Sequence, residues 1–364
     1  MCRARGGHSS LRDRSDTGTP QGISGNPGYP HRNEGNTTIP SRIADGCVLI
    51  TGGLGFVGAT LAKSLVEAGN SVTLLDSVTP AGSTAEALGL VEDPLVTCVQ
   101  GDVTDPKTFE QLADDYTHIV HAAAVLGVQR VARESLLTLD VNIRGTQMCL
   151  EFAARQRDLR RALVLSTSEV YGRHANGTPE TASLRLDTDS LRWSYAASKV
   201  AAEFLAMAYQ AEHGVPTTIV RPFNVYGPHR SLGNAMTTFV SRALRHEEIT
   251  VTGDGRQRRS WCYITDFVDG IHRCLAQDAA IGETFNIGND SATLGIQELA
   301  YLVVELSGSR SAVRLLGDAT PDVLDRAPDI SKARRLLGFR PEVGLEAGVD
   351  SVIRAMREVR GALI

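Results

Sequence analysis

A tyrosine and a lysine stand four residues apart in the stretch RWSYAASK, as Tyr195 and Lys199. Residues at this spacing share one face of a helix, so the phenol and the ammonium group would be neighbours. A nearby cation favours the phenolate over the phenol, which would let Tyr195 remove a proton near neutral pH. The start of an ordinary helix with a surface lysine would have the same sequence. The elements around the pair must therefore decide between a catalytic pair and an ordinary helix start.

A glycine-rich turn follows an apolar run in the stretch CVLITGGLGFVG. The run predicts a buried strand, and the residues from the turn to Gly69 have the apolar spacing of a helix. Glycines let the backbone approach a pyrophosphate bound at the N-terminus of such a helix. We therefore predict a dinucleotide site that includes Gly52, Gly55, Phe56, Val57 and Gly58.

An acidic residue, Asp76, ends the next predicted strand, SVTLLD. A carboxylate at this position of a dinucleotide-binding unit hydrogen-bonds the hydroxyls of the adenosine ribose. The residues that follow, SVTPAGS, include no arginine or lysine to pair with a 2′-phosphate. The predicted cofactor is therefore NAD rather than NADP.

Apolar strands and helical segments continue to alternate along the next part of the chain, which predicts an α/β fold with a Rossmann-type doubly wound parallel sheet. Ligands of such sheets bind at the carboxyl ends of the strands. Small or polar residues near these ends are further candidates for the cofactor site, namely Asp102, Val103, Ala122, Ala123, Ala124 and Asn142. Thr167, Ser168 and Glu169 follow the strand before the Tyr195 helix, so we expect them beside the phenol.

The composition is typical of a globular protein, with 42% hydrophobic residues, 22% charged residues and a net charge of −5. This charge does not indicate a nucleic-acid or anionic-membrane partner, and no apolar run is long enough to span a bilayer. The six cysteines are scattered, so we expect no metal site, no disulfide framework and a cytoplasmic location. Residues 1–45 lack apolar periodicity and are predicted to form a disordered tail.

The motifs together resemble the extended short-chain dehydrogenase/reductase family, specifically its NAD-dependent nucleotide-sugar epimerases, dehydratases and decarboxylases. The resemblance runs from Cys47 to about Val349 and includes TGGLGFVG, GDV, HAAA, NIRGT, STSEVYG, YAASK, RPFNVYGP, RRSWCYITDFVDG, FNIGN and RAPDISKARRLLGFRP. It implies that Tyr195 removes a sugar hydroxyl proton as the C4 hydride passes to NAD. It also implies that Lys199 binds the nicotinamide ribose and lowers the pKa of the phenol, and that Thr167 hydrogen-bonds the reacting oxygen.

The same resemblance implies a smaller C-terminal α/β domain that binds a UDP-sugar. We expect residues 46–223, with a returning strand near 283–289, to form the NAD-binding domain, and residues 224–282 and 290–364 to form the substrate domain. Asn224 and the segment 227–240 would contact the nucleotide diphosphate. Arginines are the expected partners of its phosphates. Arg259 is the first candidate and Arg230 another, and Arg230, Arg256 and Arg258 are equally compatible with surface charges.

The triplet Thr167-Ser168-Glu169 bears on the reaction that follows C4 oxidation. In this family 4-epimerases usually have a small or aliphatic residue in place of Glu169, and dTDP-glucose 4,6-dehydratases typically read Thr-Asp-Glu. The triplet resembles UDP-glucuronate decarboxylases (UDP-xylose synthases). That resemblance implies loss of CO₂ from a 4-keto-uronate, with Arg259 holding the carboxylate and Glu169 with Ser168 managing the proton at C5. The product would be UDP-4-keto-pentose or UDP-xylose.

Other outcomes remain open from the sequence. GDP-mannose 4,6-dehydratases share the Thr-Ser-Glu triplet, and residues 125–135 depart from the decarboxylase pattern. Dehydration, 4-epimerisation and a non-catalytic NAD-binding regulator are therefore alternatives. For assembly, predicted helices at about 132–157 and 195–213 resemble a pair that forms a four-helix homodimer interface in the family. The alternative is that these helix faces are covered within the monomer.

Overall fold

The computed structural model describes residues 42–361, apart from residues 174, 189, 231–232 and 318–322. Most of the predicted tail, residues 1–41, lies outside the described residues. Among the helices described within 42–361, none has the length and apolar character needed to cross a membrane.

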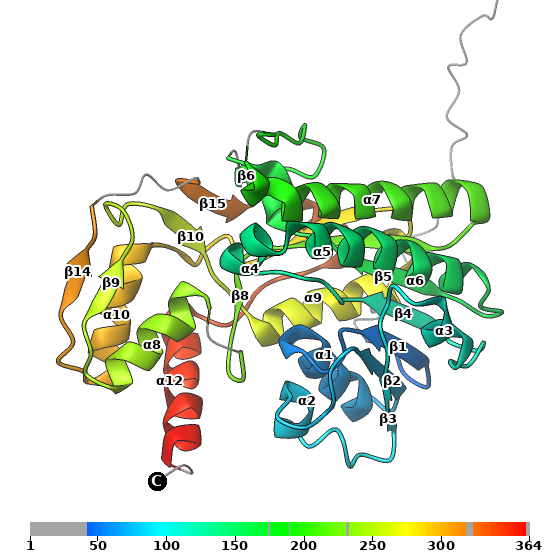
Figure 1. Cartoon of the computed structure of the whole chain (residues 1–364), viewed down its shortest axis with the longest axis horizontal. Helices are drawn as coiled ribbons and strands as arrows, with labels where there is room; N and C mark the ends of the chain where they lie inside the picture. Colours follow the sequence, from blue (N-terminus) through cyan, green and yellow to red (C-terminus); the bar gives the residue numbers. More distant parts are fainter. Residues whose placement is uncertain (1–41, 174, 189, 231–232, 318–322, 362–364) are drawn as a thin grey trace, which may run out of the picture. The chain divides into compact units, whose positions relative to one another are not determined.

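A seven-stranded sheet forms the larger part of the fold (Figure 1), and every neighbouring pair in it is parallel. Its strands, in spatial order, are β12 (Thr284–Ile287), β7 (Thr217–Pro222), β5 (Arg161–Leu165), β4 (His118–His121), β1 (Cys47–Thr51), β2 (Ser71–Asp76) and β3 (Val96–Gln100). The chain order reverses between β1 and β4, and such a reversal opens a crevice at the carboxyl ends of the strands. The predicted Rossmann-type sheet is confirmed.

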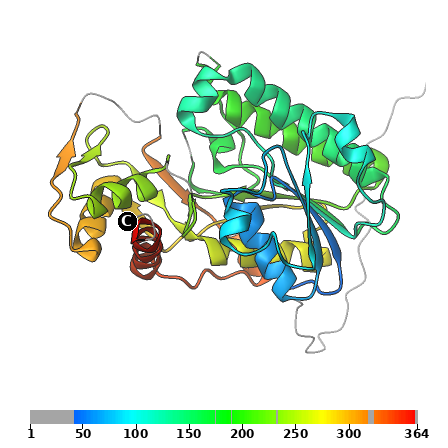
Figure 2. The same cartoon turned by 60° about the horizontal axis from the view of Figure 1, so that its bottom comes forward.

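Helices cover both faces of this sheet, because successive residues of its strands point to opposite sides. Val48 and Ile50 of β1 lie in one core cluster, and Leu49 lies in another. Figures 1 and 2 show α1 with α9 on one face, and α5, α6 and α7 side by side on the other. These helices are α1 (Phe56–Glu67), α5 (Ser135–Leu139), α6 (Gly145–Ala154), α7 (Ser194–His213) and α9 (Ile264–Ala276).

The helix expected over 132–157 is divided. A π-helical turn, Asp140–Arg144, lies between α5 and α6 and contains Asn142. The Asn142 amide accepts from the backbone N–H of Val125 at 2.8 Å and donates to the carbonyl of Val125 and to Oγ of Ser198. Widened turns of this kind occur frequently at functional sites. Here the turn brings a fully buried amide between α7 and the loop after β4.

A second, four-stranded sheet has the order β13-β10-β15-β6. Its strands are β6 (Ala175–Thr178), β10 (Arg258–Ser260), β13 (Thr293–Gly295) and β15 (Asp325–Pro328). Near it lies a separate core of α8 (Ala235–Leu244), α10 (Ile296–Ser307) and α12 (Leu345–Gly361), in which Phe239, Val303 and Ile353 are buried. Two short pairs complete the strands: β8 (Val225–Tyr226) with β11 (Cys262–Tyr263), and β9 (Ile249–Val251) with β14 (Val313–Leu315).

The remaining elements are short and connect the others. They are α2 (Thr84–Ala87), α3 (Pro106–Glu110), α4 (Val128–Arg133), α11 (Ser331–Leu337) and the 3₁₀ turns η2 (Ser168–Tyr171), η3 (Leu191–Trp193) and η4 (Asp278–Ala280).

The packing differs from the expected domain division in two helices. The sequence assigned residues 224–282 and 290–364 to the substrate domain. Helices α9 and α11 instead bury Phe267, Ile271 and Leu337 in the same core as Val48 of β1. The strand expected near 283–289 is β12, which pairs with β7 at the edge of the large sheet. Helix α9 lies in the chain segment expected to form the substrate domain, but its apolar face packs on the large sheet. This packing explains the difference from the expected domain division.

Candidate active site

The glycine turn after β1 is too closely packed for side chains. Gly52 has φ +68°, and a Cβ there would lie 2.7 Å from the backbone nitrogen of Ala123. A Cβ on Gly58 would run into the carbonyl oxygen of Gly52. Gly55 caps α1 and has no side chain to occupy the first N–H groups of the helix. This bare helix N-terminus fits the pyrophosphate of a dinucleotide.

Asp76 lies at the end of β2, beside that turn. Its carboxylate accepts from the backbone N–H of Leu54 at 3.1 Å and from that of Val78 at 3.4 Å. The contact with Leu54 ties the carboxylate to the glycine turn, in the place expected for a group that binds the adenosine ribose. Phe56 and Val57 are the first two residues of α1.

Residues after β3 and β4 occupy the neighbouring strand ends. Asp102 is exposed, and its carboxylate accepts from the N–H and the hydroxyl of Thr104, both at 2.8 Å. The side chain of Val103 lies in a core cluster, so only its backbone could face the cofactor. Ala122, Ala123 and Ala124 are half-buried, and the N–H groups of Ala122 and Ala123 donate to Thr51.

Asn142 has a different position from the one predicted. Its amide oxygen and nitrogen already bond Val125 and Ser198, and the residue is fully buried. Asn142 therefore positions the loop after β4 against α7, rather than offering its amide to a cofactor.

The structure brings Tyr195, Lys199 and Thr167 together. Tyr195 lies in the first turn of α7, Lys199 in the next, and Thr167 caps η2 directly after β5. The Thr167 hydroxyl hydrogen-bonds the phenol of Tyr195. The buried ammonium group of Lys199 donates to the carbonyl of Leu165 at 2.8 Å. The phenol and the Thr167 hydroxyl thus meet just beyond β5, and the ammonium group contacts the last residue of that strand.

The pKa of Tyr195 differs from the expectation that Lys199 lowers it. Burial raises the pKa of the phenol well above its ordinary value, and the charge of Glu169 raises it further. The groups that lower this pKa are Thr167, Arg230 and Arg326. Burial also lowers the pKa of Lys199 to about 8, so this ammonium group remains mostly charged at pH 7 and loses its charge in the mildly alkaline range.

Glu169 lies in an ion-pair cluster that the sequence did not predict. Its carboxylate accepts from Nη1 of Arg192 at 2.9 Å and from Nη1 of Arg326 at 3.4 Å. Burial alone would raise the pKa of Glu169, but Arg326 and Arg192 together hold it below its ordinary value. Ser168, next to Glu169, is buried. At neutral pH the site therefore contains a carboxylate, not a carboxylic acid.

Arg259 lies next to Arg326 on the neighbouring strand. The two residues are direct partners in the register of β10 and β15, so their side chains leave the sheet on the same face. The Arg259 guanidinium donates to the backbone carbonyls of Arg258, Val323 and Leu324. Burial, and then the charge of Arg326, lower the pKa of Arg259 to about 10.

Arg326 adds an unsatisfied donor to this cluster. The residue is 8% exposed, and among the described residues its buried Nε has no hydrogen-bond partner. A buried donor without a partner costs free energy unless a ligand satisfies it. Arg192 and Arg326 contact the carboxylate of Glu169, and Arg259 lies beside Arg326. The unsatisfied Nε of Arg326 is a buried cationic donor, so it favours an anionic ligand group.

Arg230 also acts on the phenol of Tyr195. Its guanidinium lies 5.2 Å from the centre of the Phe56 ring, and the Tyr195 phenol acts electrostatically on it. Asn224, with φ 38°, donates from its amide to the carbonyl of Ser260 at 2.8 Å. Arg256 and Arg258 are exposed, in agreement with surface charges. Part of the segment 227–240 lies outside the described residues.

Arg192 and Arg326 were the residues that sequence reasoning did not single out. Arg192 stands three residues before Tyr195 in the stretch RWSYAASK. This closeness along the chain to the proposed base could have indicated that Arg192 lies near the site. Arg326 opens RAPDISK, and only the register of β15 against β10 brings it near the site. Among the described residues, no group of His, Cys, Asp and Glu side chains is arranged to hold a metal.

The comparison with known families agrees with this geometry. The model described as the NAD dependent epimerase/dehydratase family matches residues 48–288. The chain belongs to this family. Its cofactor is NAD, which the glycine turn, Asp76 and the uncapped start of α1 fit. As an NAD-dependent enzyme of this family it has relatives named decarboxylases, dehydratases and epimerases.

Two curated relatives of this epimerase/dehydratase enzyme are decarboxylases. The UDP-N-acetyl-alpha-D-glucosaminuronate decarboxylase of Bacillus cytotoxicus is 32% identical over 325 residues, which are 85% of this chain and 98% of that protein. UDP-glucuronic acid decarboxylase 5 of Arabidopsis thaliana is 32% identical over 305 residues, or 83% and 86% of the two chains. A solved dTDP-glucose 4,6-dehydratase, DesIV of Streptomyces venezuelae with NAD bound, aligns with a TM-score of 0.77 and 31% identity over 86% of this chain and 98% of its own.

Proposed function

We propose that this enzyme is a UDP-glucuronate decarboxylase that yields UDP-4-keto-pentose, UDP-xylose or both. The observation that carries the proposal is the neighbouring pair of Arg259 and Arg326 beside Glu169 and Tyr195, in which the buried Nε of Arg326 has no partner among the described residues. A neutral sugar offers such a cluster no charge to bind, whereas a uronate offers a carboxylate. The decarboxylase names of two relatives that align over most of their length support the same reaction.

In the first step Tyr195 takes the proton of the C4 hydroxyl, and Thr167 orients that oxygen by its hydrogen bond. When bound, NAD supplies the acceptor for the C4 hydride. The phenol must lose its proton to act as a base, and its pKa is raised in the free protein. The positive charge of the nicotinamide acts in the opposite sense, because an opposite charge favours the ionised form.

In the second step the 4-keto-uronate, a β-keto acid, loses CO₂, and the electron pair moves onto the ketone oxygen as an enolate. Tyr195 and Thr167 are the groups placed to stabilise that oxygen. Arg259 and the unsatisfied Nε of Arg326 would hold the carboxylate before it leaves. Glu169, with Ser168, would then direct a proton to C5, which completes the pentose skeleton.

The test is incubation of the purified enzyme with NAD and UDP-glucuronate labelled with ¹³C at the carboxylate. NAD is supplied in one reaction in catalytic amount, which suffices if the hydride returns to C4 to give UDP-xylose, and in another in equal amount to the sugar, which release of UDP-4-keto-pentose requires. We expect labelled CO₂ and a UDP-sugar one carbon shorter, measured by mass spectrometry. UDP-N-acetylglucosaminuronate, UDP-glucose and dTDP-glucose are the comparison substrates. Products that retain all six sugar carbons would contradict decarboxylation and indicate dehydration or epimerisation. Absence of turnover with every sugar would favour an NAD-binding regulator.

We also propose that the enzyme is a homodimer through α5 and α7. These neighbouring helices expose large apolar side chains, with Leu136 85%, Phe204 64% and Met207 55% accessible. Such a patch on two packed helices fits a second copy of the same patch, which would form a four-helix arrangement.

Sedimentation tests this proposal. We expect about twice the 39.0 kDa of one chain, and the monomer mass for the double variant Phe204→Glu, Met207→Glu. The matched control is Tyr301→Glu, since Tyr301 is similarly exposed (54%) on α10. A wild-type protein that sediments as a monomer at micromolar concentration would rule the dimer out.

A further inference from the structure

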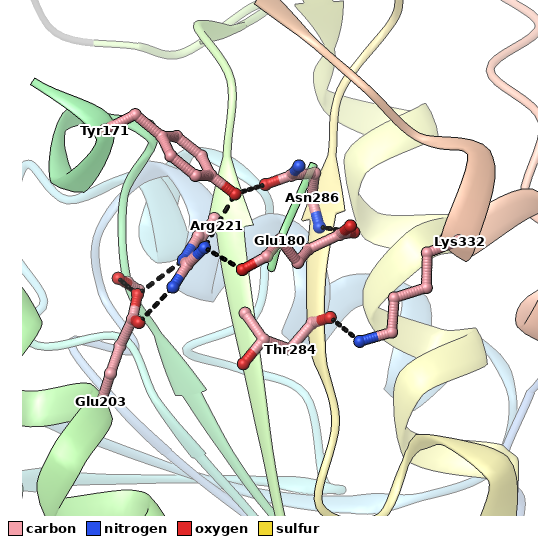
Figure 3. Close-up of polar contacts among 8 residues, drawn as sticks. Tyr171, Glu180, Glu203, Arg221, Thr284, Asn286 and Lys332 are labelled. Carbon is pink, nitrogen blue, oxygen red and sulfur yellow. Dashed lines mark hydrogen bonds and ion pairs between the residues drawn. The ribbon is translucent and has the colours of Figure 1, made fainter. Parts of the chain in front are cut away.

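A buried carboxylate, Glu203, lies on α7 one helical turn beyond Lys199. It is 5% exposed and contacts Ser166, the residue that follows β5. Arg221 of β7 binds it in a bidentate manner, from Nε to Oε1 at 2.8 Å and from Nη2 to Oε2 at 2.6 Å, as Figure 3 shows. The hydroxyl of Ser166, the residue before Thr167, donates to the same Oε1.

Arg221 extends this hydrogen-bond network beyond Glu203. Its Nη1 donates to the hydroxyl of Tyr171 at 2.7 Å and to the carbonyl of Glu180 at 3.2 Å. The Tyr171 hydroxyl in turn donates to Oδ1 of Asn286 at 2.8 Å, and the Asn286 amide donates to the carbonyls of Thr178 and Asp329 (Figure 3 shows the link from Tyr171 to Asn286). The network therefore reaches from α7 to the residue that follows β15.

These contacts enclose the short segment that holds Thr167, Ser168 and Glu169. Ser166 precedes the segment and binds Glu203 directly, and Tyr171 ends it and binds Glu203 through Arg221. Glu203 itself belongs to the helix of Tyr195 and Lys199. One ion pair thus connects both ends of the Thr-Ser-Glu segment to the helix with the phenol and the ammonium group.

The alternative is that the pair contributes only to stability. Buried ion pairs are poor contributors to stability, because the desolvation of both charges offsets most of their attraction. The Glu203–Arg221 pair connects the Thr-Ser-Glu segment to α7. We therefore attribute its presence to the geometry that it imposes on the site rather than to stability.

We propose that Glu203 and Arg221 are positioning residues of this enzyme, which hold the Thr167–Glu169 segment in register with Tyr195 and Lys199. The proposal deepens the proposed function and rests on it only for the choice of the substrate used in the assay. Neither residue touches the sugar or the cofactor in this proposal. Both act through the groups that do.

The charge of Glu203 supplies a second readout. Burial lowers the pKa of Lys199 to about 8, and Glu203 is the group that raises it. From β4, His121 also faces Lys199, but burial and Lys199 lower the pKa of His121 to about 3, so it is neutral. Both of its ring nitrogens contact threonine hydroxyls, those of Thr51 and Thr146. Removal of the Glu203 charge would therefore lower the pKa of Lys199, and the protonated lysine would be lost at a lower pH.

The experiment compares Glu203→Gln with the double variant Glu203→Gln, Arg221→Met, each with NAD bound. The double variant has no unpaired buried arginine, so it provides a folded protein if the single variant fails to fold. Hydrogen exchange of residues 166–172 is measured without substrate, and the alkaline limb of kcat/KM is measured with UDP-glucuronate. We expect exchange in this segment to accelerate about tenfold or more, and the alkaline limb to move about one pH unit lower in both variants.

Two further variants separate positioning from a general loss of stability. Asp266→Asn removes another buried carboxylate, which accepts from the backbone N–H groups of Glu342 and Val343. It should change neither the exchange of residues 166–172 nor the alkaline limb. Tyr171→Phe removes the contact at one end only, so exchange should rise near Tyr171 while the limb stays in place.

Unchanged exchange in residues 166–172 and an unchanged alkaline limb in both Glu203 variants would overturn the proposal. The exchange experiment needs no sugar, so its result stands even if the wild-type enzyme fails to decarboxylate UDP-glucuronate. That failure would contradict the proposed function alone, and the pH profile would then be measured with the nucleotide sugar that the enzyme does turn over.

Discussion

Replacement of Tyr195 by phenylalanine is expected to lower kcat with UDP-glucuronate by about 10³-fold or more, because the enzyme loses its base for the C4 hydroxyl and the donor that stabilises the enolate. The phenol is the group that Thr167, Arg230 and Arg326 all act upon. The phenylalanine variant has no hydroxyl group for these residues to ionise or orient. Steady-state assays of CO₂ release, and single-turnover assays of NADH absorbance, would measure the loss.

The Tyr195→Phe variant should still bind NAD with an affinity close to that of the wild type, since the glycine turn follows β1 and Asp76 ends β2. Tyr209→Phe is the matched control, because Tyr209 lies on the same helix far from the phenol of Tyr195. It should retain near-normal turnover. Residual activity of Tyr195→Phe within tenfold of the wild type would show that another group removes the proton.

Replacement of Glu169 by glutamine is expected to lower kcat by about 10²-fold or more, with little change in the affinity for NAD. The substitution keeps the shape of the side chain but removes the charge that neutralises Arg192 and Arg326. It also removes the carboxylate that we propose directs the proton to C5. Turnover, NAD affinity and the ratio of NADH formed to CO₂ released are the quantities to measure.

The pKa of Glu169 also predicts how wild-type activity depends on pH. Arg326 and Arg192 hold the pKa of Glu169 below its ordinary value, so the carboxylate persists as the pH falls through the range in which a free glutamate gains a proton. Wild-type activity should therefore not show an acid limb from Glu169 above about pH 4. Glu134→Gln, an exposed carboxylate paired with Arg130, is the control and should leave kcat unchanged. Normal turnover of Glu169→Gln would remove Glu169 from the mechanism.

The dinucleotide half of the site could be predicted from the sequence because its signals are local. Gly52, Gly58 and Asp76 stand within one strand–turn–helix–strand unit, where spacing along the chain fixes position in space. The same holds for Tyr195 and Lys199, four residues apart on one helix. The predicted strands CVLIT and SVTLLD agree with β1 and β2, and the helices predicted after the glycine turn and from Tyr195 agree with α1 and α7.

The arginine side of the site was beyond sequence reasoning because it depends on pairing between distant segments. Arg326 reaches Glu169 through the register of β15 with β10 and β6, which no local pattern encodes. The role of Asn142 depends on a π-helical turn that the apolar periodicity of a long helix conceals. The raised pKa of Tyr195 likewise arises first from burial, a property of the assembled fold rather than of the Tyr-x-x-x-Lys spacing.

The small sheet has a consequence for how the protein becomes active during its synthesis. Strand β6 ends at Thr178, but its partner β15 begins only at Asp325 and is therefore synthesised much later. Helix α11, which packs in the main core, is synthesised after β15. Contacts between such distant segments form slowly, because a long loop must close first. A ribosome-bound chain that has released only its first 300 residues or so already contains the glycine turn, Tyr195 and Lys199. Such a chain lacks Arg326, which bonds Glu169 in the complete fold, so we expect chemistry to begin only after β15, the last described strand, has been made.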